Sequence, residues 1–295
     1  MESIELKLKR HETFSIREGW IEKGLHYINK NPNCMSKDLG TKTFGLGTNM
    51  VKSLRYWLSA SKLTIFKSGN AYLTNLGKSI LSNDPYLENN FSLWLIHIFL
   101  VTNELDSPVF NCIFNLEYSQ FTKDFLLVNV PNKLKLYNYT EITSQSSLDS
   151  DITIFLKSYY SSDFSNPEDN MGCPLTNLHL FTCDSKNIYT RKMPNYNKLD
   201  YRIVYLNILV SLNLLDGELN LTSNSISFNV EDLFTMRNNP LNILNLSKSS
   251  LFNYLEEMQK NDLIKFTKTA GLNVVYINNI KNLETIINSY YEEVK

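Results

Sequence analysis

The chain has 295 residues, 43% of them hydrophobic and 20% charged, which is the composition of a soluble protein with two or three domains. Its net charge of −1 is unevenly distributed. Residues 1–80 carry 13 Lys and Arg against 6 Asp and Glu, a net of +7, whereas residues 81–295 carry 16 against 24, a net of −8. A solvated charge surplus is common in small domains, but a basic half is also what binding to nucleic acid requires.

The sequence predicts neither a membrane segment nor a metal site. The start of the chain has no signal-peptide pattern, and the most apolar stretch, residues 91–101, is too short to span a bilayer. A cytoplasmic location without membrane contact is therefore expected. The cysteines are scattered and indicate neither a disulfide framework nor a zinc site; they are Cys34, Cys112, Cys173 and Cys183. No cofactor is expected.

The first 85 residues are predicted to form a winged helix-turn-helix. Residues 17–29 form a helix, 34–40 a short second helix, and 48–61 an amphipathic third helix. The first helix has a predicted buried stripe of Trp20, Ile21, Gly24, Leu25 and Ile28. Two short β-prone runs, 63–66 and 71–74, follow the third helix around a Gly/Asn turn and read as a hairpin. A basic helix followed directly by a hairpin is the order of a recognition helix and its wing.

The solvent-facing side of the predicted third helix carries donors, cations and an aromatic ring, and no carboxylate. Its residues are Asn49, Lys52, Arg55, Tyr56 and Ser59, and Lys67 follows in the predicted wing. Side chains of these types bind phosphate oxygens and, less often, base edges. Double-stranded DNA is therefore the predicted partner of this face.

Residues 86–195 are predicted to form a helical middle region. It contains a buried, nearly all-apolar helix at 91–103 and a helix at 118–129 that Pro131 ends. A clear amphipathic helix starts at Leu148, and a polar loop is expected at 161–172.

Residues 196–295 are predicted to form a second winged-helix-like domain. A helix at 248–261 precedes a second hairpin, and its exposed face carries Asn253, Glu256, Glu257 and Lys260. Because two carboxylates would repel phosphates, this acidic copy is expected to be a poor DNA reader, suited instead to a partner protein or a second copy of the chain. The predicted fold is mainly α with short β-hairpins, in the α+β class.

The most distinctive polar cluster lies near the N-terminus. Its members are His11, Glu12, Arg17 and Trp20. Such a group could act in acid–base chemistry or hold a metal, but clusters of this kind are more often hydrogen-bond networks that fix a terminal segment. No HExxH, P-loop, GxSxG or CxxC pair is present, so no catalytic residue is assigned and the structural interpretation is preferred.

Several segments resemble a family of bacterial proteins, domain-of-unknown-function family 4007. The most specific motifs are HETFSIREGW at 11–20 and GLGTNMVKSLRYW at 45–57, followed by LTNLGKSIL at 73–81. Weaker similarity continues through SLDSDITIFLKSYY at 147–160 and CPLTNLHLF at 173–181. The resemblance implies a role around DNA modification, because such genes often lie near phosphorothioate-modification (Dnd-type) and phage-defence genes. It supplies no catalytic residues, and Lys62 stands where family members commonly have Gly.

Three hypotheses follow from the sequence. The first is a non-enzymatic DNA-binding component or regulator of a bacterial DNA-modification or phage-defence system, with DNA and other proteins of that system as partners. The second is a protein-interaction scaffold whose winged helices bind partner proteins or a second copy of the chain. The third is an enzyme that uses His11 and Glu12.

Overall fold

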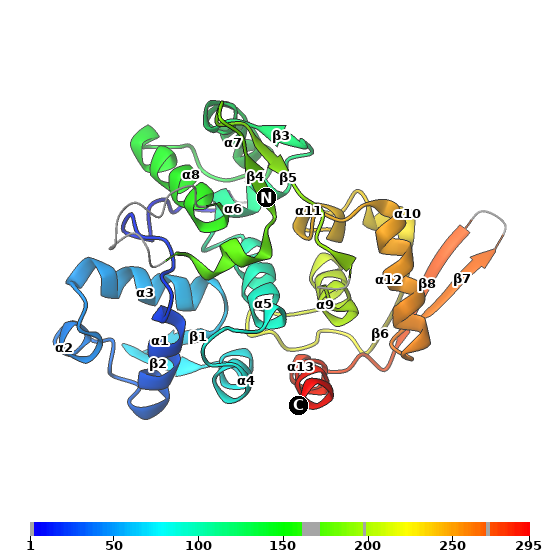
Figure 1. The fold of residues 1–295 in the computed structure, drawn as a ribbon, viewed down its shortest axis with the longest axis horizontal. Coiled ribbons are helices and arrows are strands. Elements are labelled where there is room, and N and C mark those ends of the chain that lie inside the picture. The colour runs from blue at the N-terminus through cyan, green and yellow to red at the C-terminus, as the bar shows by residue number, and fades with distance from the viewer. Residues whose placement is uncertain (1–2, 161–171, 197–198, 270–271) are drawn as a thin grey trace. The chain divides into compact units, whose positions relative to one another are not determined.

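The structure is a computed structural model that describes residues 3–160, 172–196, 199–269 and 272–295 (Figure 1). Across these ranges it contains thirteen α-helices, one 3₁₀ helix and three small antiparallel sheets, so the protein is α+β and mainly helical, as predicted. The chain divides into two compact units, Met1–Lys192 and Met193–Lys295, called here the first and the second unit. The predicted boundary at residue 85 lies inside the first unit. The polar loop predicted at 161–172 lies outside the described residues except for Gly172.

The first unit contains eight α-helices and five strands within the part of it that is described. The helices are α1 (Trp20–Lys30), α2 (Gly40–Phe44), α3 (Thr48–Ala60), α4 (Asn75–Asn83), α5 (Asn90–Val101), α6 (Pro108–Phe114), α7 (Lys123–Leu136) and α8 (Gln145–Tyr159), with the 3₁₀ helix η1 at Pro174–Leu178. The strands are β1 (Thr64–Lys67), β2 (Asn70–Leu73), β3 (Gln120–Phe121), β4 (Phe181–Cys183) and β5 (Tyr189–Arg191). β1 and β2 pair as a hairpin, and the other three form a sheet in the order β3-β5-β4.

The first and third N-terminal helices follow the sequence pattern, and the hairpin strands lie within one residue of the predicted runs. The short second helix predicted at 34–40 is wrong, because these residues form turns and α2 begins at Gly40. The buried residues of α1 are the predicted stripe, and Gly24 lets α3 approach, since a Cβ there would lie 2.6 Å from Leu58 Cδ1. In the hairpin turn, Ser68 and Gly69 both have positive φ, 51° and 82°. Positive φ at both central residues is the type I′ geometry that suits a two-residue hairpin.

The rest of the first unit is built around α5, which is buried along almost its whole length, as its apolar sequence predicts. An aromatic cluster packs beside it and includes Phe114, Phe155, Tyr159 and Phe181. The expectation that Pro131 ends a helix is wrong, because α7 continues to Leu136. Its buried residues Leu126, Val130 and Leu134 lie on both sides of the proline and offset the lost backbone hydrogen bond.

The second unit repeats the order of a helix followed by a hairpin. Its helices are α9 (Tyr201–Ser211), α10 (Val230–Leu233), α11 (Pro240–Ile243), α12 (Lys248–Lys260) and α13 (Leu283–Val294). Its strands β6 (Ser225–Asn229), β7 (Lys265–Thr269) and β8 (Leu272–Asn278) form an antiparallel sheet in the order β6-β8-β7. Among the described residues of both units, no helix has the length and apolarity needed to cross a membrane.

Candidate nucleic-acid interface

The helix α3 is buried along two sides. Val51, Leu54 and Leu58 lie on the side that packs within the α1–α3 bundle, as the amphipathic pattern predicts. Its second buried side carries Ser53, Tyr56 and Trp57. Only the remaining part of the helix surface is open to solvent, and it is widest over the first half of the helix, at Asn49 and Lys52.

The prediction that Tyr56 faces solvent is wrong. This side chain is 6% exposed, and its hydroxyl donates to the backbone oxygen of Asp106 at 3.1 Å. Burial raises the pKa of Tyr56 far above its usual range, so the hydroxyl stays protonated as a donor. The Arg10 guanidinium lies 5.5 Å from the centroid of its ring. Tyr56 is therefore part of the packing of the first unit and cannot contact a ligand without unpacking.

The other predicted contact residues remain at the surface to different degrees. Asn49, Lys52 and Lys67 are exposed, whereas Arg55 and Ser59 are half-buried. The Arg55 guanidinium carbon lies 4.1 Å from the centroid of the Phe66 ring, a cation–π contact that joins α3 to the hairpin. We call Asn49, Lys52, Arg55 and Lys67 the α3 basic face.

An exposed aromatic residue on the hairpin was missed by the sequence analysis. Tyr72 on β2 is 43% exposed and lies opposite Ile65 in the hairpin. The alternation in Asn70–Leu73 gives the signal that could have found it, since the buried Ala71 directs its two neighbours to the other face.

The N-terminal strap, residues 4–14, covers the second buried side of α3 (Figure 1). The Trp57 indole N–H donates to the Phe14 backbone oxygen at 2.9 Å, and the Ser53 hydroxyl donates to the same oxygen at 3.3 Å. At its other end the strap pairs with the loop after α7, where the Ile4 N–H donates to the Asn138 oxygen at 2.8 Å. The strap is therefore anchored at both ends.

Two carboxylates far along the chain hold the middle of the strap. Asp151, on α8, accepts from the Lys9 backbone N–H at 2.8 Å and lies 3.2 Å from His11 Nε2. Asp106, in the loop before α6, pairs with Arg10. Sequence reasoning missed both, although Asp151 sits next to Ile152 on the apolar side of its helix and is only 6% exposed. A carboxylate on an apolar stripe is a signal of a buried polar partner.

The predicted cluster of His11, Glu12, Arg17 and Trp20 is split between two environments. His11 is fully buried, and its Nδ1 accepts from the Thr13 N–H at 3.1 Å, which leaves Nε2 to donate to Asp151. Its ring stacks near Trp57, with the ring centroids 6.1 Å apart. Arg17 instead lies over the rings of Phe14 and Trp20.

Glu12 is directed toward α3. Its Oε1 lies 3.6 Å from Lys52 Nζ, which also donates to Asn49 Oδ1 at 3.4 Å. His11 and Glu12 therefore serve different partners and do not converge on one reaction centre. In the described ranges, no three or more His, Cys, Asp or Glu side chains are grouped so that they could hold a metal ion.

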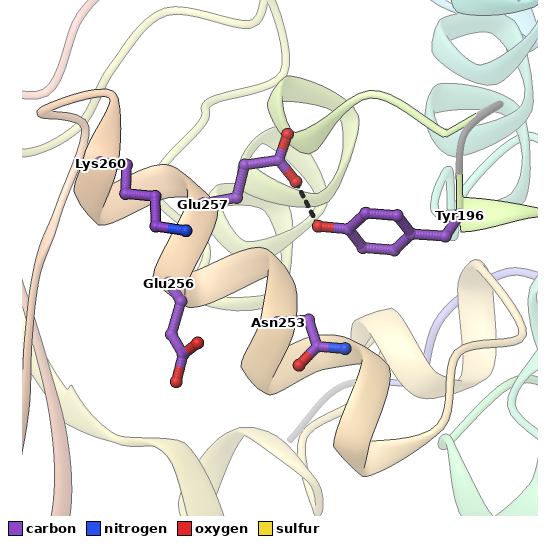
Figure 2. A pocket seen from close by; sticks show the side chains of 5 residues that line it. All are labelled: Tyr196, Asn253, Glu256, Glu257 and Lys260. Atoms are coloured by element: carbon purple, nitrogen blue, oxygen red, sulfur yellow. Dashed lines mark hydrogen bonds between the residues drawn. The ribbon is translucent and has the colours of Figure 1, made fainter.

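The matching helix of the second unit presents a different surface. A cleft of about 460 Å³ runs along the exposed face of α12 and is lined by Tyr196, Asn253, Glu256, Glu257 and Lys260 (Figure 2). The Tyr196 hydroxyl donates to Glu257 Oε2 at 2.6 Å. Lys268 lies 2.6 Å from Glu256 Oε1 and lowers the pKa of that carboxyl. The carboxylates expected on this face are thus at the surface, where they repel phosphate.

Comparisons with known proteins support a shared fold and define a family. Two crystal structures of a protein named SspB, one of them bound to magnesium ion, superpose with TM-scores of 0.84 and 0.83 at 23% sequence identity. Each alignment covers 99% of this chain and 90% of the SspB chain. No curated protein sequence matches the chain. The family described as "Protein of unknown function (DUF4007)" matches residues 8–291, nearly the whole length, and the chain therefore belongs to the DUF4007 family.

Proposed function

We propose that the protein binds duplex DNA through the α3 basic face, as a component or regulator of a bacterial DNA-modification or phage-defence system. The observation that carries this proposal is the exposure of Asn49 and Lys52 on a helix, and of Lys67 on the hairpin that directly follows it. The same segment, residues 1–80, has a net charge of +7 from 13 basic and 6 acidic residues. A basic surface of this kind supplies the phosphate contacts on which non-specific DNA affinity depends.

In this proposal α1, α2 and α3 form the tri-helical unit of a winged helix-turn-helix, with α3 as the recognition helix and β1–β2 as the wing. The burial of Tyr56 in the second half of α3 is compatible with this role. Recognition helices of the helix-turn-helix class contact base edges mainly with their N-terminal residues. Asn49 and Lys52 occupy that part of α3, and Lys67, at the end of β1, would contact the adjacent DNA backbone.

The part of the proposal that concerns DNA modification comes from the family resemblance. Genes of this family are often found beside phosphorothioate-modification and phage-defence genes, which supports a partnership with DNA and with other proteins of such a system. The location expected for such a component is the cytoplasm.

A titration of duplex DNA at several salt concentrations tests the proposal. The double variant Lys52→Ala, Lys67→Ala should bind a fluorescent random-sequence duplex more weakly and flatten the plot of log affinity against log salt by about 0.9 for each lost phosphate contact. The matched control is Lys260→Ala, Lys265→Ala, which removes two exposed lysines from the second unit and should leave the slope unchanged. An unchanged slope in the folded Lys52, Lys67 variant would contradict the proposal.

The same titration should be run with and without magnesium, on plain and on phosphorothioate-containing duplexes. One of the two similar SspB structures is bound to magnesium ion, which motivates this arm. Denaturing gels of the same samples report strand cleavage, so binding and an enzymatic activity are measured separately. Cleavage that His11→Ala abolishes, in a variant that remains folded, would favour the enzyme hypothesis.

A second candidate function is protein binding by the second unit. The exposed face of α12, with Glu256, Glu257 and the Tyr196-lined cleft, favours a basic protein surface over a polyanion. The partner would be another protein of the system or a second copy of the chain. Sedimentation of the wild type and of the double variant Glu256→Ala, Glu257→Ala tests binding to a second copy of the chain. Self-association through this face should weaken in the variant.

A further inference from the structure

The α3 basic face contains a carboxylate that comes from outside the helix. Glu12 belongs to the N-terminal strap, yet its Oε1 lies 3.6 Å from Lys52 Nζ, at side-chain exposures of 33% for Glu12 and 57% for Lys52. Lys52 is the exposed cation of α3 nearest to the helix N-terminus. A negative charge therefore occupies the position where a DNA phosphate would meet this lysine.

The structure holds this carboxylate in place through the backbone of the strap. Glu12 and Thr13 both have positive φ, 50° and 73°, a conformation that non-glycine residues adopt at a cost. The surrounding bonds maintain it, because the Glu12 N–H donates to the Lys9 oxygen at 3.2 Å and the Thr13 N–H donates to the buried His11 ring at 3.1 Å. The backbone from which the Glu12 side chain extends toward Lys52 is therefore held in place.

We infer that Glu12 is a tethered competitor of DNA phosphate for Lys52, so that the N-terminal strap sets the DNA affinity of the α3 basic face. The inference rests on the proposed function and adds its regulation. A competitor fixed to the same chain acts at a high effective concentration, independent of protein dilution. When DNA binds, the Lys52 ammonium leaves the Glu12 carboxylate for a phosphate, and Glu12 is left beside a like charge.

The expected effect is moderate and depends on salt. An exposed ion pair contributes only about 0.1–0.7 units of log affinity, and repulsion across several ångströms of water adds a similar amount. Removing the Glu12 charge should therefore tighten duplex binding by about three- to ten-fold at low salt, with a smaller gain as screening increases. The competitor weakens the electrostatic contact of Lys52 with any DNA, whatever its sequence.

The test is a double-mutant cycle in the full-length protein. Duplex DNA affinity is measured at low salt for the wild type, Glu12→Gln, Lys52→Ala and the double variant. Glu18→Gln is the matched control, because Glu18 is an exposed glutamate of the same unit and its removal changes the net charge equally. Thermal unfolding of each variant shows whether it is as stable as the wild type.

Glu12→Gln should tighten binding more than Glu18→Gln does, and the excess should disappear in the Lys52→Ala background. If Glu12→Gln and Glu18→Gln have equal effects, while Lys52→Ala and Lys67→Ala still weaken binding, the inference is wrong and the proposed function stands. If neither the wild type nor Glu12→Gln binds duplex DNA, the proposed function itself fails. The two failures are therefore distinguishable.

Discussion

The helices α3 and α12 are alike in length and in the elements that follow them, but they differ in what covers their surfaces. Each has 13 residues, each has a left-handed residue two positions after its end, and each is followed by a hairpin. At the ninth and tenth positions, however, α3 has Tyr56 and Trp57, and α12 has Glu256 and Glu257. The aromatic pair is buried under the N-terminal strap, whereas Glu256 is exposed and Glu257 lines an open cleft. A shared order of elements therefore does not imply a shared surface.

Net charge is also unevenly distributed along the chain. The segment 193–295 has 9 Lys and Arg against 11 Asp and Glu, a net of only −2, whereas residues 81–192 have 7 against 13, a net of −6. The C-terminal segment is therefore only weakly acidic, and most of the net negative charge after residue 80 lies in residues 81–192. The feature of α12 that would repel phosphate is the local pair Glu256 and Glu257 on its exposed face, since the potential close to a surface follows the nearest charges.

The largest difference between the two helices should be in stability. Trp57→Ala removes a fully buried side chain and its hydrogen bond to Phe14, so the free energy of unfolding of the first unit should fall by about 3–5 kcal/mol. Glu257→Ala, at the matching position of α12, should cost less than about 1 kcal/mol, because it removes only a surface hydrogen bond. Urea unfolding followed by circular dichroism measures both. Equal losses of unfolding free energy in the two variants would contradict the difference between the buried side of α3 and the exposed face of α12.

The two units should differ in their affinity for duplex DNA. The fragment 1–192 should retain most of the duplex affinity of the whole chain, and the fragment 193–295 should bind at least about tenfold more weakly. The cut at 192 is preferred to one near residue 85, which would remove Asp106, Phe110 and Asp151 from the strap and α3. Fluorescence anisotropy at low salt measures the affinities. A folded 193–295 fragment that binds as tightly as 1–192 would show that the exposed carboxylates do not matter.

The smallest expected effect concerns the left-handed residue that lies just after each of the two helices. Lys62 and Asp262 follow α3 and α12 with φ of 57° and 56°, and in each case the next residue bonds back to the helix, Leu63 to Leu58 and Leu263 to Met258. This is the Schellman arrangement, in which glycine is favoured. Lys62→Gly and Asp262→Gly should each stabilise their unit by about 0.5–1 kcal/mol, because the left-handed strain outweighs the added freedom of the unfolded chain.

Alanine at the same two positions is the control for this prediction. Lys62→Ala and Asp262→Ala keep the Cβ and therefore the left-handed strain, so neither should stabilise its unit. A gain with alanine equal to that with glycine would mean that the original side chains, and not the backbone conformation, are unfavourable.

Much of the local structure could be predicted from the sequence, because it depends on near neighbours. The apolar stripe of α1, the limits of α3, the hairpin that follows it and the burial of α5 follow from periodicity, from the Gly/Asn turn and from composition. The conformation of Lys62, two residues after α3, was not predicted. It has a φ of 57°, in the left-handed region that glycine commonly occupies after a helix end.

Only the tertiary structure decided which face of α3 remains open. Tyr56 lies on the polar side of the helical pattern, but contacts with Asp106 and with the strap remove it from solvent. Those contacts join residues far apart in the chain, such as Lys9 and Asp151, which are separated by 142 positions. Helical periodicity reports only which residues share a face of one helix. Whether water, a strap or DNA covers that face depends on segments that the pattern does not include, and this is why the placement of Glu12 beside Lys52 emerged only in the folded chain.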